Sequence, residues 1–179
     1  NRANRFMGTY WKAETVKFEK DSLGRLPQNA QATIYITCVD NVQARFGVAE
    51  ILKELCNRRN HRDTPKYWLD FGNSQHTGQV ILSTIGEIKQ PNSEKYETVA
   101  SLPFVTEEFG ELLRQSEQQD DTPSCSLAEA LEKQELFINS ALAQMGCSLL
   151  WSLFRYGMTE YRGFFLNLGN FQSQPLKVA

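Results

Sequence analysis

Two short stretches of this chain hold residues of types and spacing that could do chemistry. Asp40 and Asn41 lie in "ITCVDNVQAR", with Arg45 about one helical turn further on, and Cys125 lies in "PSCSLAEAL". An acid at the carboxyl end of a buried strand can hold a magnesium ion against a triphosphate. A cysteine at a helix start has its thiolate favoured by the helix dipole and by unpaired amides. The first stretch therefore indicates nucleotide chemistry and the second an acyl-accepting thiol.

Each stretch also has a plainer interpretation. Asp40 or Asn41 would serve equally as the N-cap of the following helix, with Arg45 as a surface arginine. Cys125 has acidic neighbours that oppose a thiolate and no histidine close in sequence, so an ordinary helix-start cysteine is the alternative. Both alternatives stay open at this point.

Length, charge and cysteine usage limit the class of protein. The chain has 179 residues and is 41% hydrophobic, which suits one domain spanning 1–179. Its net charge of −2 provides no basic field for nucleic acid or anionic lipid. The other three cysteines, Cys38, Cys56 and Cys147, form no CxxC pair with each other or with Cys125. This pattern predicts reduced core thiols in a cytoplasmic protein and no zinc site.

Hydrophobic periodicity predicts the elements that must position these residues. Strands are expected at 9–18, 31–40, 67–73 and 77–88, helices at 41–59, 105–116 and 136–154, and a last pair of strands around "NLGN". The order strand, helix, strand predicts an α/β sheet with flanking helices. The nearly continuous apolar run at 31–40 is typical of a strand buried on both faces of a parallel sheet.

The helix predicted at 136–154 carries no formal charge, so a membrane span has to be considered. Ser140, Gln144, Ser148 and Ser152 recur every four residues and form a polar stripe along one side. This stripe favours a buried or interface helix and no membrane. A homodimer formed through this helix follows as an expectation.

The order and spacing of three motifs resemble the ThiF/MoeB/HesA family of ubiquitin-like-protein-activating enzymes. The motifs are "ITCVDNVQAR", "YWLDFGNSQHTGQVIL" and "PSCSLAEAL" ahead of the long small-residue helix. Within that family, "NRFMGTYW" and "GFFLNLGNFQSQPLKV" look most like the ThiF-type protein of PRTRC cassettes. The resemblance covers nearly the whole chain and begins partway into the family domain.

The resemblance implies an ATP- and Mg²⁺-dependent adenylation of the C-terminus of a ThiS- or MoaD-like partner. Asp40 takes the place of the family's magnesium-holding acid, and Cys125 that of the cysteine that some members use to accept the acyl group. The residues expected to bind nucleotide or partner are Asn41, Arg45, Gly72, Gly78 and Gln79. Residues 89–123, polar, acidic and bounded by prolines, correspond to the crossover loop over the partner's tail.

The sequence departs from the family in two ways. The CxxC pairs that hold zinc in many members are missing, and the nucleotide-binding glycine loop belongs ahead of Asn1. The expected fold is therefore a Rossmann-like α/β sheet whose N-terminal nucleotide-loop portion is missing from this chain. Two other functions remain open: a catalytically silent ThiF-like module that binds a small ubiquitin-like or cassette partner, and a Rossmann-type enzyme acting on a small molecule.

Overall fold

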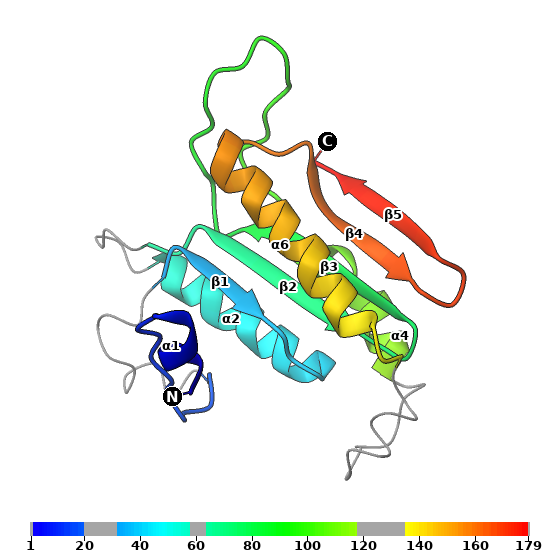
Figure 1. The fold of residues 1–179 in the computed structure, drawn as a ribbon. Coiled ribbons are helices and arrows are strands. Elements are labelled where there is room, and N and C mark those ends of the chain that lie inside the picture. The colour runs from blue at the N-terminus through cyan, green and yellow to red at the C-terminus, as the bar shows by residue number, and fades with distance from the viewer. Residues whose placement is uncertain (1, 20–31, 58–63, 118–134, 179) are drawn as a thin grey trace.

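The protein has a mixed five-stranded sheet with helices on both faces (Figure 1). The structure is a computed structural model and describes residues 2–19, 32–57, 64–117 and 135–178. The strands lie in the order β1-β2-β3-β4-β5. Their bounds are β1 Ile34–Thr37, β2 Tyr67–Asn73, β3 Thr77–Thr84, β4 Tyr161–Asn167 and β5 Gln172–Lys177. β1 and β2 pair in parallel and the following pairs are antiparallel, so the α/β class is confirmed.

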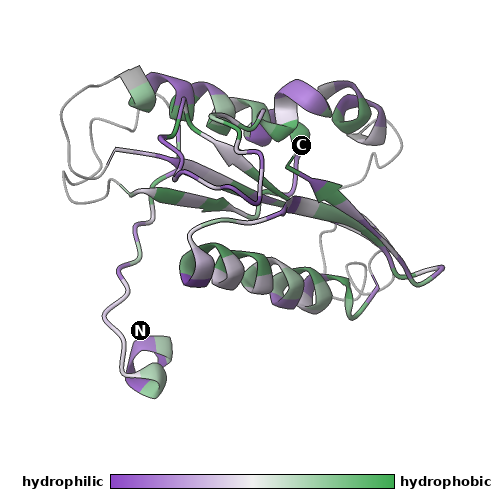
Figure 2. Ribbon diagram, turned by 90° about the horizontal axis from the view of Figure 1, so that it is seen from above, coloured by the Kyte–Doolittle hydropathy of each residue, from purple (hydrophilic) through white to green (hydrophobic). Residues whose placement is uncertain are grey.

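The sheet separates two helical layers, which Figure 2 shows with the sheet seen nearly edge-on. The helices are α1 Arg2–Met7, α2 Val42–Asn57, α3 Val105–Glu108, α4 Gly110–Glu117 and α6 Ile138–Tyr156. α2, α3 and α4 cover one face of the sheet and α6 covers the other. The parallel connection runs through α2, as a crossover between parallel strands requires.

Alternating side chains explain why the central strands are buried on both faces. In β2, Trp68 packs into the cluster under α2, while Leu69 packs into the cluster under α6. β3 repeats the pattern, because Ile81 joins the α2 side and Val80 joins the α6 side. Since successive residues of a strand point to opposite faces, an apolar run fills both layers at once.

Helix α6 contacts the sheet through a stripe of every fourth residue. Ile138, Leu142 and Gly146 are its buried positions. The predicted polar stripe lies away from the sheet, and Ser140, Gln144 and Ser148 are exposed. In the described part of the chain, no helix combines the length and apolar character needed to cross a membrane.

Most of the predicted elements are confirmed, with two corrections. Residues 9–18 form no strand, and Tyr10 and Trp11 are 95% and 77% exposed. The Asn4 side chain instead bonds the backbone of Trp11, donating to its carbonyl at 2.7 Å and accepting from its amide at 3.0 Å. These bonds occupy the groups that a strand partner would use.

The run at 31–40 forms a shorter and more exposed strand than predicted. β1 spans four residues, and Ile36 is 54% exposed. Among the described strands β1 pairs with β2 alone, so it lies at an edge of the sheet. The apolar run was therefore correctly assigned to a strand and wrongly expected to be buried on both faces.

Gly146 allows α6 to approach the sheet closely, which predicts a destabilising effect of a methyl group there. A Cβ at this position would lie 2.5 Å from the Phe71 ring, whereas a Cβ at Gly47 of α2 would meet nothing within 4 Å. Gly47→Ala should raise the free energy of unfolding by about 0.5–1 kcal/mol through helix propensity. Gly146→Ala should lower it by about 1 kcal/mol, because overpacking outweighs that gain.

Urea denaturation of both variants measures this difference. Equal stabilisation by the two substitutions would show that α6 does not rest on β2 at Gly146.

Candidate active site

The carboxyl end of β1 leads directly into α2 through Asp40 and Asn41. The Asn41 side-chain oxygen accepts a 2.7 Å hydrogen bond from the amide of Ala44, so Asn41 is the N-cap of α2. Such a cap typically stabilises a helix by about 1 kcal/mol. Asp40 is exposed, and its Oδ1 accepts a 3.1 Å hydrogen bond from the Asn41 side-chain amide. The structure thus presents one carboxylate to solvent where the strand ends and the helix begins.

Arg45 is buried, so its interpretation as a surface arginine is wrong. Its side chain is 5% exposed, and its Nε lies 2.8 Å from Oδ2 of Asp70 in β2. Its Nη2 donates to the carbonyl oxygens of Val39 at 3.0 Å and Phe71 at 3.2 Å. One guanidinium therefore joins the start of α2 to the end of β1 and to β2.

Asp70 is held from β1 as well. Thr37 lies opposite Asp70 in the parallel register and donates a 2.8 Å hydrogen bond to its Oδ1. The indole of Trp68 donates to the Thr37 hydroxyl oxygen at 2.7 Å. Burial raises the pKa of Asp70, while the charge of Arg45 and the hydrogen bonds from Thr37 and Arg45 oppose that rise.

The structure brings two more of the predicted site residues to Arg45 and separates a third. Gly72 and Gln79 are paired across β2 and β3. A methyl group at Gly72 would lie 2.9 Å from Nη2 of Arg45 and would also overlap the Gln79 side chain. A methyl group at Gly78 would instead lie 2.5 Å from Leu142 of α6. Gly78 therefore faces the opposite side of the sheet, away from Arg45.

The side-chain oxygens near the carboxyl end of β1 suit a Mg²⁺ ion shared with substrate phosphates better than a metal ion bound by protein side chains alone. Within the described ranges, no group of three or more His, Cys, Asp and Glu side chains could hold a metal ion. Mg²⁺ usually keeps several waters and takes one or two carboxylates together with substrate phosphates. The exposed Asp40 carboxylate fits that arrangement and does not resemble a dedicated all-protein cage.

Several sequence predictions concern other parts of the chain. Cys125 and the end of the predicted crossover loop, residues 118–123, lie outside the described residues. Cys38 and Cys147 are exposed, so the expectation of a core thiol is wrong for these two, whereas Cys56 is partly buried and packs against the core under α2. Cys38 follows the last residue of a short edge strand, and Cys147 lies on the outer side of α6.

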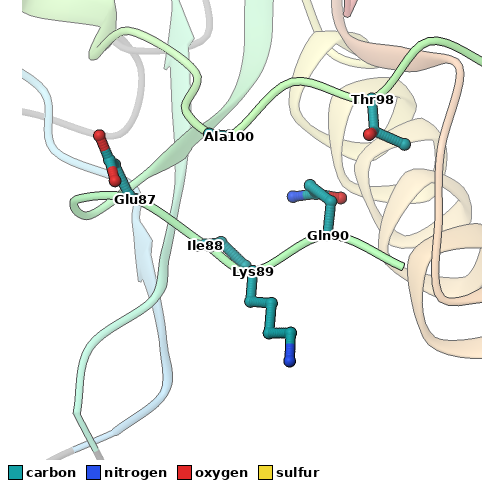
Figure 3. Close-up of a pocket in the computed structure, with 6 residues that line it drawn as sticks. All are labelled: Glu87, Ile88, Lys89, Gln90, Thr98 and Ala100. Atoms are coloured by element: carbon teal, nitrogen blue, oxygen red, sulfur yellow. The ribbon is translucent and has the colours of Figure 1, made fainter. Parts of the chain in front are cut away.

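A hollow of about 430 Å³ lies where the segment after β3 leads into the predicted crossover loop (Figure 3). It lies between two runs of chain, which the amide of Ile88 and the carbonyl of Ala100 join by a 2.8 Å hydrogen bond. Its lining residues are Glu87, Ile88, Lys89, Gln90, Thr98 and Ala100. None of the predicted site residues lines this hollow, and the Lys89 side chain points away from the opposite run in Figure 3.

Comparison with known proteins assigns this chain to no family. No protein-family model matches it, and no curated protein sequence matches it either. The ThiF/MoeB/HesA resemblance therefore stays a prediction that rests on the motifs themselves.

Sequence reasoning missed Asp70, although "YWLDFG" contains a usable signal. An acid in the middle of an apolar strand must find a partner or pay a large desolvation cost. Arg45, on the helix that packs over this strand, was the natural candidate. Thr37 carried no comparable signal, because threonine is common in strands of every kind.

The thiol of Cys38 offers a chemical report on the charge of Asp70. Cys38 is exposed as a residue, but the partial burial of its thiol raises its pKa, and the negative charge of Asp70 raises the pKa further. Asp70→Asn removes that charge, so the alkylation of Cys38 by iodoacetamide should reach its half-maximal rate at a lower pH than in the wild type. The rate-pH profile of each labelled peptide, followed by mass spectrometry, measures the shift.

Cys147 serves as the control in the same sample, because it lies on α6 across the sheet and its profile should not change. An unaltered Cys38 profile in Asp70→Asn would mean that Asp70 carries no charge felt at Cys38.

Proposed function

We propose that this chain belongs to an ATP- and Mg²⁺-dependent adenylating domain of the ThiF/MoeB/HesA type. Its substrate would be the C-terminal carboxylate of a small ubiquitin-like protein of the ThiS or MoaD kind. The observation that carries the proposal is Asp40, an exposed carboxylate at the carboxyl end of β1 and at the start of α2. In open α/β sheets, ligands bind outside the carboxyl ends of parallel strands.

The parallel unit of β1, α2 and β2 supports a Rossmann-like interpretation of the fold. β1 and β2 run in the same direction, so their carboxyl ends lie at the same end of the sheet, where Asp40 is found. The N-terminus of α2 at the same edge contributes a positive dipole end, which favours phosphate groups. This geometry suits a triphosphate that binds beside Asp40.

The reaction requires little proton transfer by side chains of the protein. An oxygen of the partner's carboxylate attacks the α-phosphorus of ATP, and the bond to pyrophosphate breaks, which leaves an acyl-adenylate. When bound, Mg²⁺ would neutralise phosphate charge, and Asp40 would hold it. Positioning and charge neutralisation are the main catalytic effects in such a transfer.

The remaining sequence predictions enter the proposal as partner contacts. Gln79 and Gly72 lie beside Arg45, where they would lie beneath the partner's tail, and 89–123 would close over it. The outer side of α6 exposes the uncharged Ser140, Gln144 and Ser148, which suits a homodimer interface. The proposal places this activity in the cytoplasm, where cysteine thiols stay reduced.

ATP–pyrophosphate exchange tests the proposed role of Asp40. The full-length protein, supplied with a MoaD-type ubiquitin-like protein, should exchange labelled pyrophosphate into ATP. Asp40→Ala should reduce the exchange rate by roughly 100-fold or more, since it removes a charge-stabilising group from the transition state. Glu50→Ala is the matched control, because it removes an exposed carboxylate of α2 away from Asp40 and should leave the rate unchanged.

Three other outcomes of the exchange assay would contradict parts of the proposal. Retained exchange in Asp40→Ala would exclude Asp40 as the magnesium-holding acid. Partner binding without any exchange in the wild type would identify a silent binding module, and turnover without a protein partner would identify a small-molecule enzyme.

Cys125 has a separate test, because it would act after adenylation. Cys125→Ala should leave the pyrophosphate exchange rate intact and abolish a thiol-sensitive adduct between the two proteins. Non-reducing electrophoresis and intact mass of the reaction mixture, with and without thiol, measure that adduct. Cys147→Ala is the control, and an adduct that persists in Cys125→Ala would make Cys125 an ordinary helix-start cysteine.

A further inference from the structure

The buried pair of Arg45 and Asp70 lies beside the proposed site. Arg45 donates hydrogen bonds to two backbone carbonyls next to residues of that site. Arg45 Nη2 donates to the carbonyl of Val39, whose peptide bond leads into Asp40. The same nitrogen donates to the carbonyl of Phe71, whose peptide bond leads into Gly72. Both carboxylate oxygens of Asp70 accept from Nε of Arg45, Oδ2 at 2.8 Å and Oδ1 at 3.0 Å.

The pair is part of a continuous chain of donors and acceptors that starts in the core. The Trp68 indole, which is fully buried, donates to Thr37, and the Thr37 hydroxyl donates to Asp70. Asp70 accepts from Arg45, and Arg45 then donates to Val39. Asp70 accepts from both Thr37 and Arg45, and Arg45 donates both to Asp70 and to Val39, so each group in this series has a defined role as donor or acceptor. The outer end of the series is the carbonyl just before Asp40.

A buried ion pair is a poor way to gain stability. Taking both charges out of water costs several kcal/mol per ion, and apolar residues of similar volume often stabilise a core equally well. The geometry here does something that an apolar pair cannot do, since one guanidinium fixes a carbonyl oxygen just after β1 and another within β2. The pair is therefore better explained by the placement that it imposes.

We propose that Arg45 and Asp70 are positioning residues, which hold the Val39–Asp40 peptide and thereby orient the Asp40 carboxylate. Arg45 then acts on the nucleotide site through Asp40, and its guanidinium makes no contact with nucleotide or partner. The benefit of this orientation for adenylation rests on the proposed function, whereas the fixing of the Val39–Asp40 peptide is a property of the chain alone.

A second buried arginine provides a matched control. Arg162 of β4 is also 5% exposed in its side chain and pairs with Glu108 of α3. Both arginines are nearly buried and each pairs with one carboxylate on a neighbouring element, but the Arg162 pair joins β4 to α3 and makes no bond to the segment between β1 and α2. Arg45→Lys and Arg162→Lys keep the positive charge and remove the planar guanidinium with its several N–H donors.

Amide hydrogen exchange of the intact chain tests the positioning itself. The reporters are the amides of Ala44 and Arg45, which bond the side-chain and main-chain oxygens of Asn41. The exchange rates of these amides should be about tenfold or more higher in Arg45→Lys than in Arg162→Lys, after correction for the free energy of unfolding of each variant. The reason is that the charge-assisted hydrogen bonds beside these amides are lost only in Arg45→Lys. Thr37→Val, which removes one link and keeps the ion pair, should give a smaller increase. Equal exchange at these amides in Arg45→Lys and Arg162→Lys would overturn the inference, and if Arg45→Lys does not fold, unchanged exchange in Thr37→Val would overturn it.

A kinetic readout in the full-length protein separates positioning from direct contact. Arg45→Lys should lower the maximal rate of pyrophosphate exchange by about tenfold or more with little change in the KM for ATP, since charged hydrogen bonds that orient Asp40 are lost. A raised KM with an unchanged maximal rate would make Arg45 a nucleotide contact and would overturn the inference. If the wild type shows no exchange at all, the adenylation proposal fails, and the amide exchange still decides the positioning.

Discussion

The parallel pairing of β1 with β2 is the constraint on which the proposed site depends. The register places Thr37 opposite Asp70, and α2 returns over the same two strands with Arg45 at the end of its first turn. A shift of one residue would turn Asp70 to the α6 side of the sheet, among leucine and phenylalanine side chains, and would leave Arg45 as an unpaired buried charge. The ion pair thus strongly penalises a shift of one residue in this register. This specificity is the best-attested use of buried charges.

The remainder of the sheet has a different role. β2, β3 and β4 form an antiparallel series whose apolar residues fill a layer on each side, under α2 and under α6. Gly146 lets α6 lie close to Phe71, and Gly72 leaves room for the side chains of Arg45 and Gln79. The central strands therefore form a rigid platform between two cores, and the polar groups gather at one end of it. A rigid support of this kind limits the motion of a side chain such as Asp40 at its edge.

The sequence predicted the fold where periodicity was strong and missed what depends on distant partners. β2 spans the seven residues expected of it, and α2 begins and ends within two residues of its expected bounds. The strand at 9–18 failed because alternation alone cannot supply a neighbouring strand. At the site, the cap by Asn41 was predictable from local chemistry, whereas the burial of Arg45 was not. That burial follows from pairing with Asp70, 25 residues further along the chain, and it becomes predictable only when the acid in the apolar strand is considered together with the helix that packs over it.

The burial of Trp68 has an optical consequence. The chain contains three tryptophans, of which Trp11 and Trp151 are 77% and 62% exposed, while Trp68 is completely enclosed. Indoles in water emit at longer wavelengths than indoles in an apolar interior, so the blue side of the fluorescence spectrum belongs to Trp68. This indole also starts the series of hydrogen bonds that ends at Val39. The protein therefore carries an intrinsic fluorophore in the buried network behind the proposed site, without any added label.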